Sequence, residues 1–124
     1  MKILVVDDEE QRHFGFRLAY PTANIAKAYN VEQAIRVIDT YDFDLIYLDH
    51  DLQDFEHFTD GRKPLEHTGS EICSYLIKKG YTGKVIIHSW NTAASLRMKK
   101  MFEDAGINVS YEPYQSYTAK QEIK

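Results

Sequence analysis

The sequence contains one cysteine, Cys73, and therefore cannot form an intrachain disulfide. This absence excludes a disulfide-stabilised scaffold and favours a cytoplasmic location. Cys73 lies within a helical pattern, which indicates core packing rather than a nucleophile. No apolar run approaches the roughly 20 residues that span a bilayer, and the N-terminus lacks a signal-peptide pattern. We therefore expect no membrane association.

The chain is also short of positive charge, glycine and proline. Its 15 Lys and Arg against 19 Asp and Glu give a formal charge of −4, which argues against broad DNA binding but not against a local basic patch. Six glycines and three prolines occur without repeats, low-complexity tracts or a linker. With 44% apolar residues in 124, the sequence predicts a single domain over residues 1–124 with a substantial core.

Short apolar runs alternate with helical patterns along the chain, which is typical of β/α units around a parallel sheet. The expected strands are 2–8, 23–29, 44–52, 84–90 and 108–113, and the expected helices are 9–20, 30–42, 68–80 and 91–106. Right-handed connections then predict an α/β fold of the flavodoxin-like, doubly wound type, with a five-stranded parallel sheet in the order 2-1-3-4-5.

The helix ends carry recognisable signals. Asn30, Thr68 and Asn91 are expected N-caps, and Pro21 ends the first helix. In that first helix the spacing predicts that apolar side chains face inward, namely Phe14, Leu18 and, as a third candidate, Phe16.

Two segments show no regular period. Residues 53–67 form an irregular polar loop, and long ordered loops of this kind are usually functional. Its His57, Arg62, Lys63 and His67 could close over an anion, although for His57 we favour the alternative of a solvated polar loop. The tail at about 113–124 has too few apolar residues to predict a final helix. The tyrosines near it could stack on a nucleobase or pack in the core, and they are Tyr111, Tyr114 and Tyr117.

Ionisable side chains follow three of the predicted strands. In doubly wound sheets the ligand site lies at the carboxyl ends of the strands, near the switch between strands 1 and 3. The expected rim therefore brings together Asp7, Asp8, Asp49, His50, Asp51, His88 and Ser89. Burying such groups is costly unless they are paired, hydrogen-bonded or bound to a metal.

Four aspartates in one crevice repel one another, and a divalent cation is one remedy. Carboxylate oxygens suit Mg²⁺ or Mn²⁺, which typically take one or two carboxylates, several waters and a substrate phosphate. Neighbouring strand residues face opposite sides, so we expect Asp8 and Asp49 as direct ligands with Asp7 close behind. The alternative is that these carboxylates cap the following helices, which applies most to Asp51.

The two histidines at the rim suggest proton transfer. His50 and His88 are candidates for general base and general acid, in either order, and the alternative is a hydrogen-bonded core role. Ser89, Asn91, Thr68 and Asp51 are candidates for binding phosphate or substrate. For Asn91 a helix cap is an equally good and compatible interpretation, because a helix N-terminus favours a phosphate oxygen.

The segments "ILVVDDE", "DLIYLDHDL", "KVIIHSW" and "YEPY" resemble, in order, the four signature segments of response-regulator receiver domains. The resemblance implies that Asp7 and Asp8 hold Mg²⁺, that Asp49 accepts a phosphoryl group, and that Ser89 is the switch residue. Receivers carry a lysine where this chain has Glu112, and that difference argues against ordinary phosphorelay signalling.

A closer resemblance is to the cyclic-phosphate processing receiver domain family. It rests on "DHDL" at residues 49–52, "TG" at 68–69, "HSWN" at 88–91 and Met98 in the next helix. It implies a metal-dependent phosphoesterase acting on a cyclic phosphate, such as a cyclic nucleotide or an RNA cyclic-phosphate end. The alternatives are a non-catalytic binder of a phosphate ligand or protein partner and, third, a phosphoacceptor at Asp49.

Overall fold

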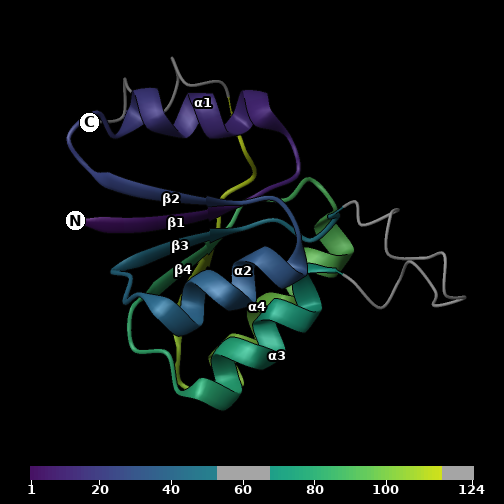
Figure 1. The fold of residues 1–124 in the computed structure, drawn as a ribbon. Coiled ribbons are helices and arrows are strands. Elements are labelled where there is room, and N and C mark those ends of the chain that lie inside the picture. Colours follow the sequence, from purple (N-terminus) through teal and green to yellow (C-terminus); the bar gives the residue numbers. More distant parts are fainter. Residues whose placement is uncertain (53–67, 116–124) are drawn as a thin grey trace, which may run out of the picture.

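The computed structural model describes residues 1–52 and 68–115 (Figure 1). Its strands are β1 (Lys2–Val6), β2 (Asn24–Ala28), β3 (Leu45–Leu48), β4 (Lys84–Ile87) and β5 (Asn108–Tyr111). They form one parallel sheet in the order β2-β1-β3-β4-β5. The predicted fold class and strand order are confirmed.

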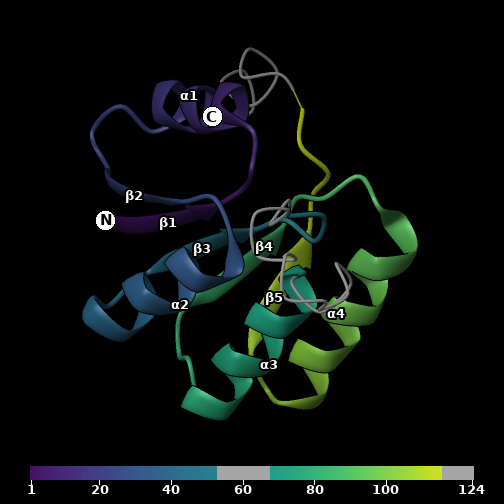
Figure 2. The same ribbon diagram turned by 45° about the vertical axis from the view of Figure 1, so that its right-hand side comes forward.

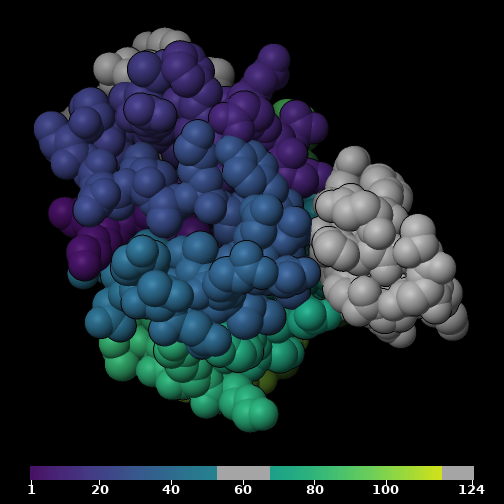
Figure 3. All heavy atoms as spheres, in the orientation of Figure 1, coloured from purple at the N-terminus to yellow at the C-terminus, as the bar shows by residue number. Residues whose placement is uncertain are grey.

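The helices divide unequally between the two faces of the sheet. They are α1 (Glu10–Ala19), α2 (Val31–Thr40), α3 (Gly69–Lys79) and α4 (Thr92–Asp104). Figures 1 and 2 show α1 on one face and the other three helices together on the opposite face. In the space-filling view, the purple to blue N-terminal half covers the upper and central part of the molecule, and α3 forms its lower edge (Figure 3).

The alternation of side chains along each strand produces two cores. Leu4, Val6 and the even-numbered side chains of β3 pack with α2, α3 and α4, where Phe102 and Met98 are fully buried. Ile3, Val5 and Tyr47 pack on the other face against Phe16 of α1. The central strands β1, β3 and β4 are thus apolar on both faces, as their nearly continuous hydrophobic runs require.

The inward face of α1 differs from the prediction. Phe14 is 60% exposed and Leu18 is also exposed, whereas Phe16, His13 and Gly15 are buried. The apolar spacing was misleading because a polar residue, His13, occupies an inward position: its Nε2 lies 2.8 Å from the Asp7 carbonyl oxygen. A buried histidine satisfied by backbone is not visible as part of an apolar stripe.

The predicted helix caps are confirmed. The Asn30 side chain accepts from the Gln33 N–H, that of Thr68 from the Ser70 N–H, and that of Asn91 from the Ala94 N–H. Gly80 ends α3 at φ +77°, a left-handed conformation that glycine adopts at low cost. In the described part of the chain, no helix is long and apolar enough to cross a membrane.

Candidate functional site

The ends of β1, β3 and β4 meet at one level of the sheet. Val6 pairs with Leu48, and Leu48 pairs with Ile87. The ladder continues for one more residue, because the N–H groups of Asp49 and His88 donate to the carbonyls of Val6 and Leu48. Asp7, Asp49 and His88 are therefore side by side at the carboxyl edge of the sheet.

The same alternation that forms the two cores sorts the ionisable side chains. Asp7, Asp49 and His88 continue the rows that face α1, and all three are buried. One carboxylate oxygen from each aspartate and one ring nitrogen lie within 4.8 Å of one another. His50 and Ser89, one residue further along, belong to the opposite rows.

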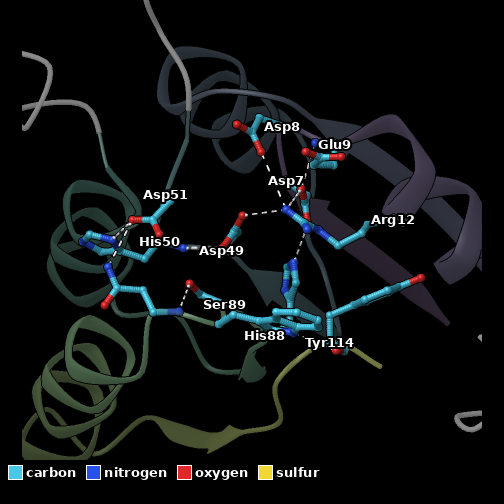
Figure 4. Close-up of polar contacts among 12 residues, drawn as sticks. Asp7, Asp8, Glu9, Arg12, Asp49, His50, Asp51, His88, Ser89 and Tyr114 are labelled. Atoms are coloured by element: carbon cyan, nitrogen blue, oxygen red, sulfur yellow. Dashed lines mark hydrogen bonds and ion pairs between the residues drawn. The ribbon is translucent and has the colours of Figure 1, made fainter. Parts of the chain in front are cut away.

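An arginine from α1 forms ion pairs with this cluster (Figure 4). Arg12 Nε lies 2.6 Å from Asp7 Oδ2, and Nη2 lies 2.9 Å from Asp7 Oδ1, which makes a two-point ion pair. Nη2 is also 3.4 Å from Asp49 Oδ2 and 3.8 Å from Asp8 Oδ1. One guanidinium thus contacts all three carboxylates that the sequence assigns to a metal.

His88 holds the other side of Asp7. Its Nε2 is 2.7 Å from Asp7 Oδ2, and its ring packs edge-on against Phe16 and Tyr47. An ionised carboxylate can only accept a hydrogen bond, so Nε2 carries the proton. The other ring nitrogen, Nδ1, is buried and has no hydrogen-bond partner among the described residues.

These contacts decide the charge of Asp7. Burial alone would raise its pKa, but the hydrogen bonds from His88 and Arg12, with a further one from the Glu9 N–H, outweigh burial and lower the pKa to about 2. Asp7 is therefore ionised at neutral pH although its side chain is fully buried.

The other two carboxylates are less well compensated. Burial, together with the negative charges of Asp7 and Asp49, raises the pKa of Asp8 to about 6. Burial also raises the pKa of Asp49, with a further contribution from Asp7 that His88 and Arg12 only partly oppose. The cluster still favours additional positive charge, which is the condition expected of a cation site.

A pocket of about 250 Å³ opens above these groups. Its wall includes Asp8, Glu9, Arg12, Asp49 and His88. Asp51, Ser89 and Trp90 complete its lining on the side of α4. The pocket is open to solvent and lined by charge, so it suits a hydrated ion or a phosphate rather than an apolar ligand.

The remaining predicted site residues form a second group beside the pocket. His50 Nδ1 lies 2.7 Å from Asp51 Oδ1, and Asn91 Nδ2 donates to the same oxygen at 3.3 Å. Figure 4 shows the His50 ring on the far side of Asp51 from Arg12. The structure thus separates His50 from His88, because consecutive residues after β3 point in opposite directions. The catalytic and ligand roles assigned to these residues stay predictions.

The "TG" motif has a packing reason. Thr68 caps α3, and the Gly69 N–H donates to the His50 carbonyl at 2.8 Å. A Cβ at position 69 would collide with the Asp49 carbonyl oxygen and lie 2.8 Å from His50 Cα. Only glycine allows the first turn of α3 to approach the end of β3 this closely. Gly69 therefore helps to fix the backbone of Asp49.

The described residues that follow β5, 112–115, include no lysine or arginine. The Glu112 N–H donates to the Ile87 carbonyl, and Glu112 Oε2 accepts from Ser110 Oγ. Tyr111 donates to the Ser89 carbonyl at 2.9 Å, and the Tyr114 ring packs against Phe16 and His88. Both tyrosines have packing contacts. His57, Arg62, Lys63, His67 and Tyr117 lie outside the described residues.

Sequence reasoning missed Arg12 and His13. Both come from α1, for which the apolar spacing predicts only core packing. The available signal was spacing: Arg12 follows Asp8 by four residues, the separation at which helical side chains meet. His13, one residue later, points to the buried face and supports the Asp7 backbone.

The fold is shared with receiver domains of known structure. A CheY-like response regulator receiver protein from Methanospirillum hungatei JF-1 is 19% identical with a TM-score of 0.67, covering 98% of this chain and 89% of its own. Response regulator TrrA from Thermotoga maritima, solved in complex with Mg²⁺ and BeF, is 21% identical with a TM-score of 0.65, covering 92% and 86%. The non-phosphorylated HemR receiver domain from Leptospira biflexa is 19% identical with a TM-score of 0.68, covering 98% and 88%.

At these identities the likeness concerns the fold alone. No curated protein matches the sequence. The family model described as the cyclic-phosphate processing receiver domain matches residues 2–104, which span most of the chain and include every residue of the acid cluster. The chain therefore belongs to the cyclic-phosphate processing receiver domain family.

Proposed function

We propose that this protein is a metal-dependent phosphoesterase that opens a cyclic phosphate to a phosphate monoester. The observation that carries the proposal is the Asp7–His88–Asp49 cluster, whose ligand atoms lie within 4.8 Å of one another beside an open pocket. Membership of the cyclic-phosphate processing family supports the substrate class.

The residues fit a divalent cation such as Mg²⁺ or Mn²⁺. Asp7, Asp8 and Asp49 offer hard oxygen ligands, and the pKa values of Asp8 and Asp49 are raised by burial first and by the neighbouring carboxylates second, a cost that a bound cation would relieve. These three carboxylates would hold the ion, with Arg12 giving up part of its contacts. A bound divalent cation would stabilise the charge that develops on the phosphoryl oxygens.

The reaction requires a water oxygen to bond to phosphorus while one ring P–O bond breaks. The water loses a proton to a base, and the departing sugar oxygen gains one from an acid. His88 carries a proton on Nε2 beside Asp7, and His50 is held through Nδ1 by Asp51, so its Nε2 is the nitrogen that can exchange a proton. Ser89 and Asn91, before and at the start of α4, would orient the phosphate.

The test is turnover of nucleoside 2′,3′-cyclic and 3′,5′-cyclic phosphates with Mg²⁺ or Mn²⁺, followed by chromatography of the monoester. Asp49→Asn and His88→Gln should each reduce turnover at least a hundredfold. Asp104→Asn is the matched control, because this exposed acid on α4 pairs only with Lys100 among the described residues, 3.6 Å away. Ligand that binds tightly but is recovered intact would instead establish a non-catalytic binder.

A second candidate is a phosphoacceptor at Asp49. Asp49 is buried at the end of β3 between Arg12 and Ser89, so a cation and a hydroxyl adjoin it. TrrA, which shares the fold, was solved with Mg²⁺ and BeF. Acetyl phosphate with Mg²⁺ should then label wild-type protein but not Asp49→Asn. Cyclic-phosphate turnover without labelling would leave the phosphoesterase as the function.

A further inference from the structure

A large aromatic side chain lies exposed at the edge of the acidic pocket. Trp90 is 74% exposed and lines the same pocket as Arg12 and Asp49. A single exposed apolar residue is common on protein surfaces and needs no explanation by itself. What distinguishes Trp90 is its position beside the charged groups and the way its ring is held.

The indole is fixed by a hydrogen bond to the chain that follows β5. Trp90 Nε1 donates to the Tyr114 carbonyl at 2.7 Å. Tyr114 is itself anchored, because its N–H donates to the His88 carbonyl and its ring packs against Phe16. The exposed ring face is therefore oriented before any ligand arrives, which reduces the entropy lost on binding.

The pocket is too small to enclose a whole nucleotide. About 250 Å³ is less than the roughly 300–1,000 Å³ of pockets that enclose drug-sized ligands. A phosphate bound near Asp49 would leave the rest of a nucleotide to extend along the lining toward Trp90. Aromatic faces bind nucleobases by stacking, at about 1–3 kcal/mol per base.

We propose that Trp90 is the stacking platform for the nucleobase of a nucleoside cyclic phosphate. This inference rests on the proposed function and narrows it to ligands that carry a base next to the cyclic phosphate. Stacking tolerates every base, because each has a π-face. The site accordingly selects nucleosidic cyclic phosphates over base-free ones without strong preference among bases.

Trp90 is the only tryptophan in the chain, so intrinsic fluorescence reports on it directly. The protein with Mg²⁺ is titrated with 2′,3′-cyclic AMP, with glycerol 1,2-cyclic phosphate, and with a short RNA ending in a 2′,3′-cyclic phosphate. Saturable quenching by the first and third, but not by the base-free compound, is expected. The ratio of their affinities shows whether a free nucleotide or an RNA end is preferred.

Variants separate stacking from other effects. Trp90→Leu should weaken 2′,3′-cyclic AMP binding in calorimetry by about 5- to 150-fold, the equivalent of 1–3 kcal/mol, and leave glycerol cyclic phosphate unchanged. Trp90→Phe should restore most of the affinity. Tyr41→Leu, an exposed aromatic replaced elsewhere on the surface, should have no effect.

The outcomes distinguish the two proposals. Equal affinity for base-bearing and base-free compounds, or unchanged binding by Trp90→Leu, overturns the stacking role and leaves the phosphoesterase intact. Absence of binding and turnover for every cyclic phosphate overturns both.

Discussion

Replacing Arg12 by glutamine tests whether the guanidinium stands in for a metal ion. Arg12 makes a two-point contact with fully buried Asp7 and reaches Asp49 and Asp8 at 3.4 and 3.8 Å. Breaking a buried ion pair costs roughly 3–5 kcal/mol. Arg12 is 31% exposed, so solvent screening reduces this figure to about 2 kcal/mol. Arg12→Gln should lose that much stability in EDTA.

The same substitution should strengthen metal binding. A divalent cation and a guanidinium about 4 Å apart repel by roughly 8 kcal/mol at an effective dielectric of 20, so the ion must displace the guanidinium or share carboxylates with it. If only 1.4 kcal/mol of this repulsion persists after Arg12 moves aside, the wild type binds the ion tenfold more weakly than Arg12→Gln. Mg²⁺ at a hundred times its Kd should then return about 2.7 kcal/mol to the variant.

Urea unfolding followed by circular dichroism, in EDTA and in Mg²⁺, measures both effects, and calorimetry gives the Mg²⁺ affinity directly. Arg36→Gln is the matched control, since its ion pair with Glu32 is on the surface of α2 and is 69% exposed on the arginine side. That change should cost at most about 0.5 kcal/mol, with or without the ion. An Arg12→Gln variant as stable as the wild type in EDTA, with unaltered Mg²⁺ affinity, refutes the reasoning.

Three other predictions concern Asp8 and two residues that contact the acid cluster, His88 and Gly69. Asp8 has a pKa raised from 3.8 to about 6, so its protonated form stabilises the fold below pH 4 and this contribution is lost as the pH rises through 6. Asp8→Asn in EDTA should therefore be more stable than the wild type at pH 7.5, by up to about 3 kcal/mol, with no difference at pH 4; equal stability at both pH values would contradict this. His88→Leu removes a donor to buried Asp7, whose lowered pKa gives stability that is present above about pH 4 and lost toward pH 2. An acid titration should show a loss of about 1–3 kcal/mol at pH 7 that shrinks at low pH, and a pH-independent loss would count against it. Gly69→Ala, which forces a Cβ into the Asp49 backbone, should destabilise the fold by about 2 kcal/mol in urea and weaken Mg²⁺ binding, and an unchanged midpoint would show that the contact is not tight.

The fold could be predicted because its signals are local. The strands are short apolar runs. Each of the caps at Asn30, Thr68 and Asn91 depends on one side chain and a backbone N–H two or three residues later. Parallel strands with right-handed connections leave few topologies, so the strand order followed. The meeting of Asp7 with Asp49 and His88 came from topology alone.

The details of the site depend on the direction in which each side chain points, and the sequence indicates this less well than it indicates the fold. His50 and His88 were paired as acid and base, yet the alternation after β3 places the His50 ring beside Asp51 and Asn91. Arg12 was missed because its role needs a long side chain to cross from α1 to three strand ends, a contact that apolar periodicity does not reveal. The one sequence signal for this contact is the four-residue spacing from Asp8 to Arg12, because side chains four residues apart in a helix lie on the same face.

The source of positive charge separates this site from the receiver pattern it resembles. Where that pattern has a lysine after strand 5, this chain has Glu112, hydrogen-bonded to Ser110. Among the residues that the structure describes, the cation at the acids is Arg12 of α1, which binds the carboxylates themselves. A lysine across from Asp49 would pair with a phosphoryl group after transfer, whereas the guanidinium here pairs with the acids themselves and must move aside for a cation. This difference from the receiver pattern is one reason why we propose a phosphoesterase first and a phosphoacceptor at Asp49 second.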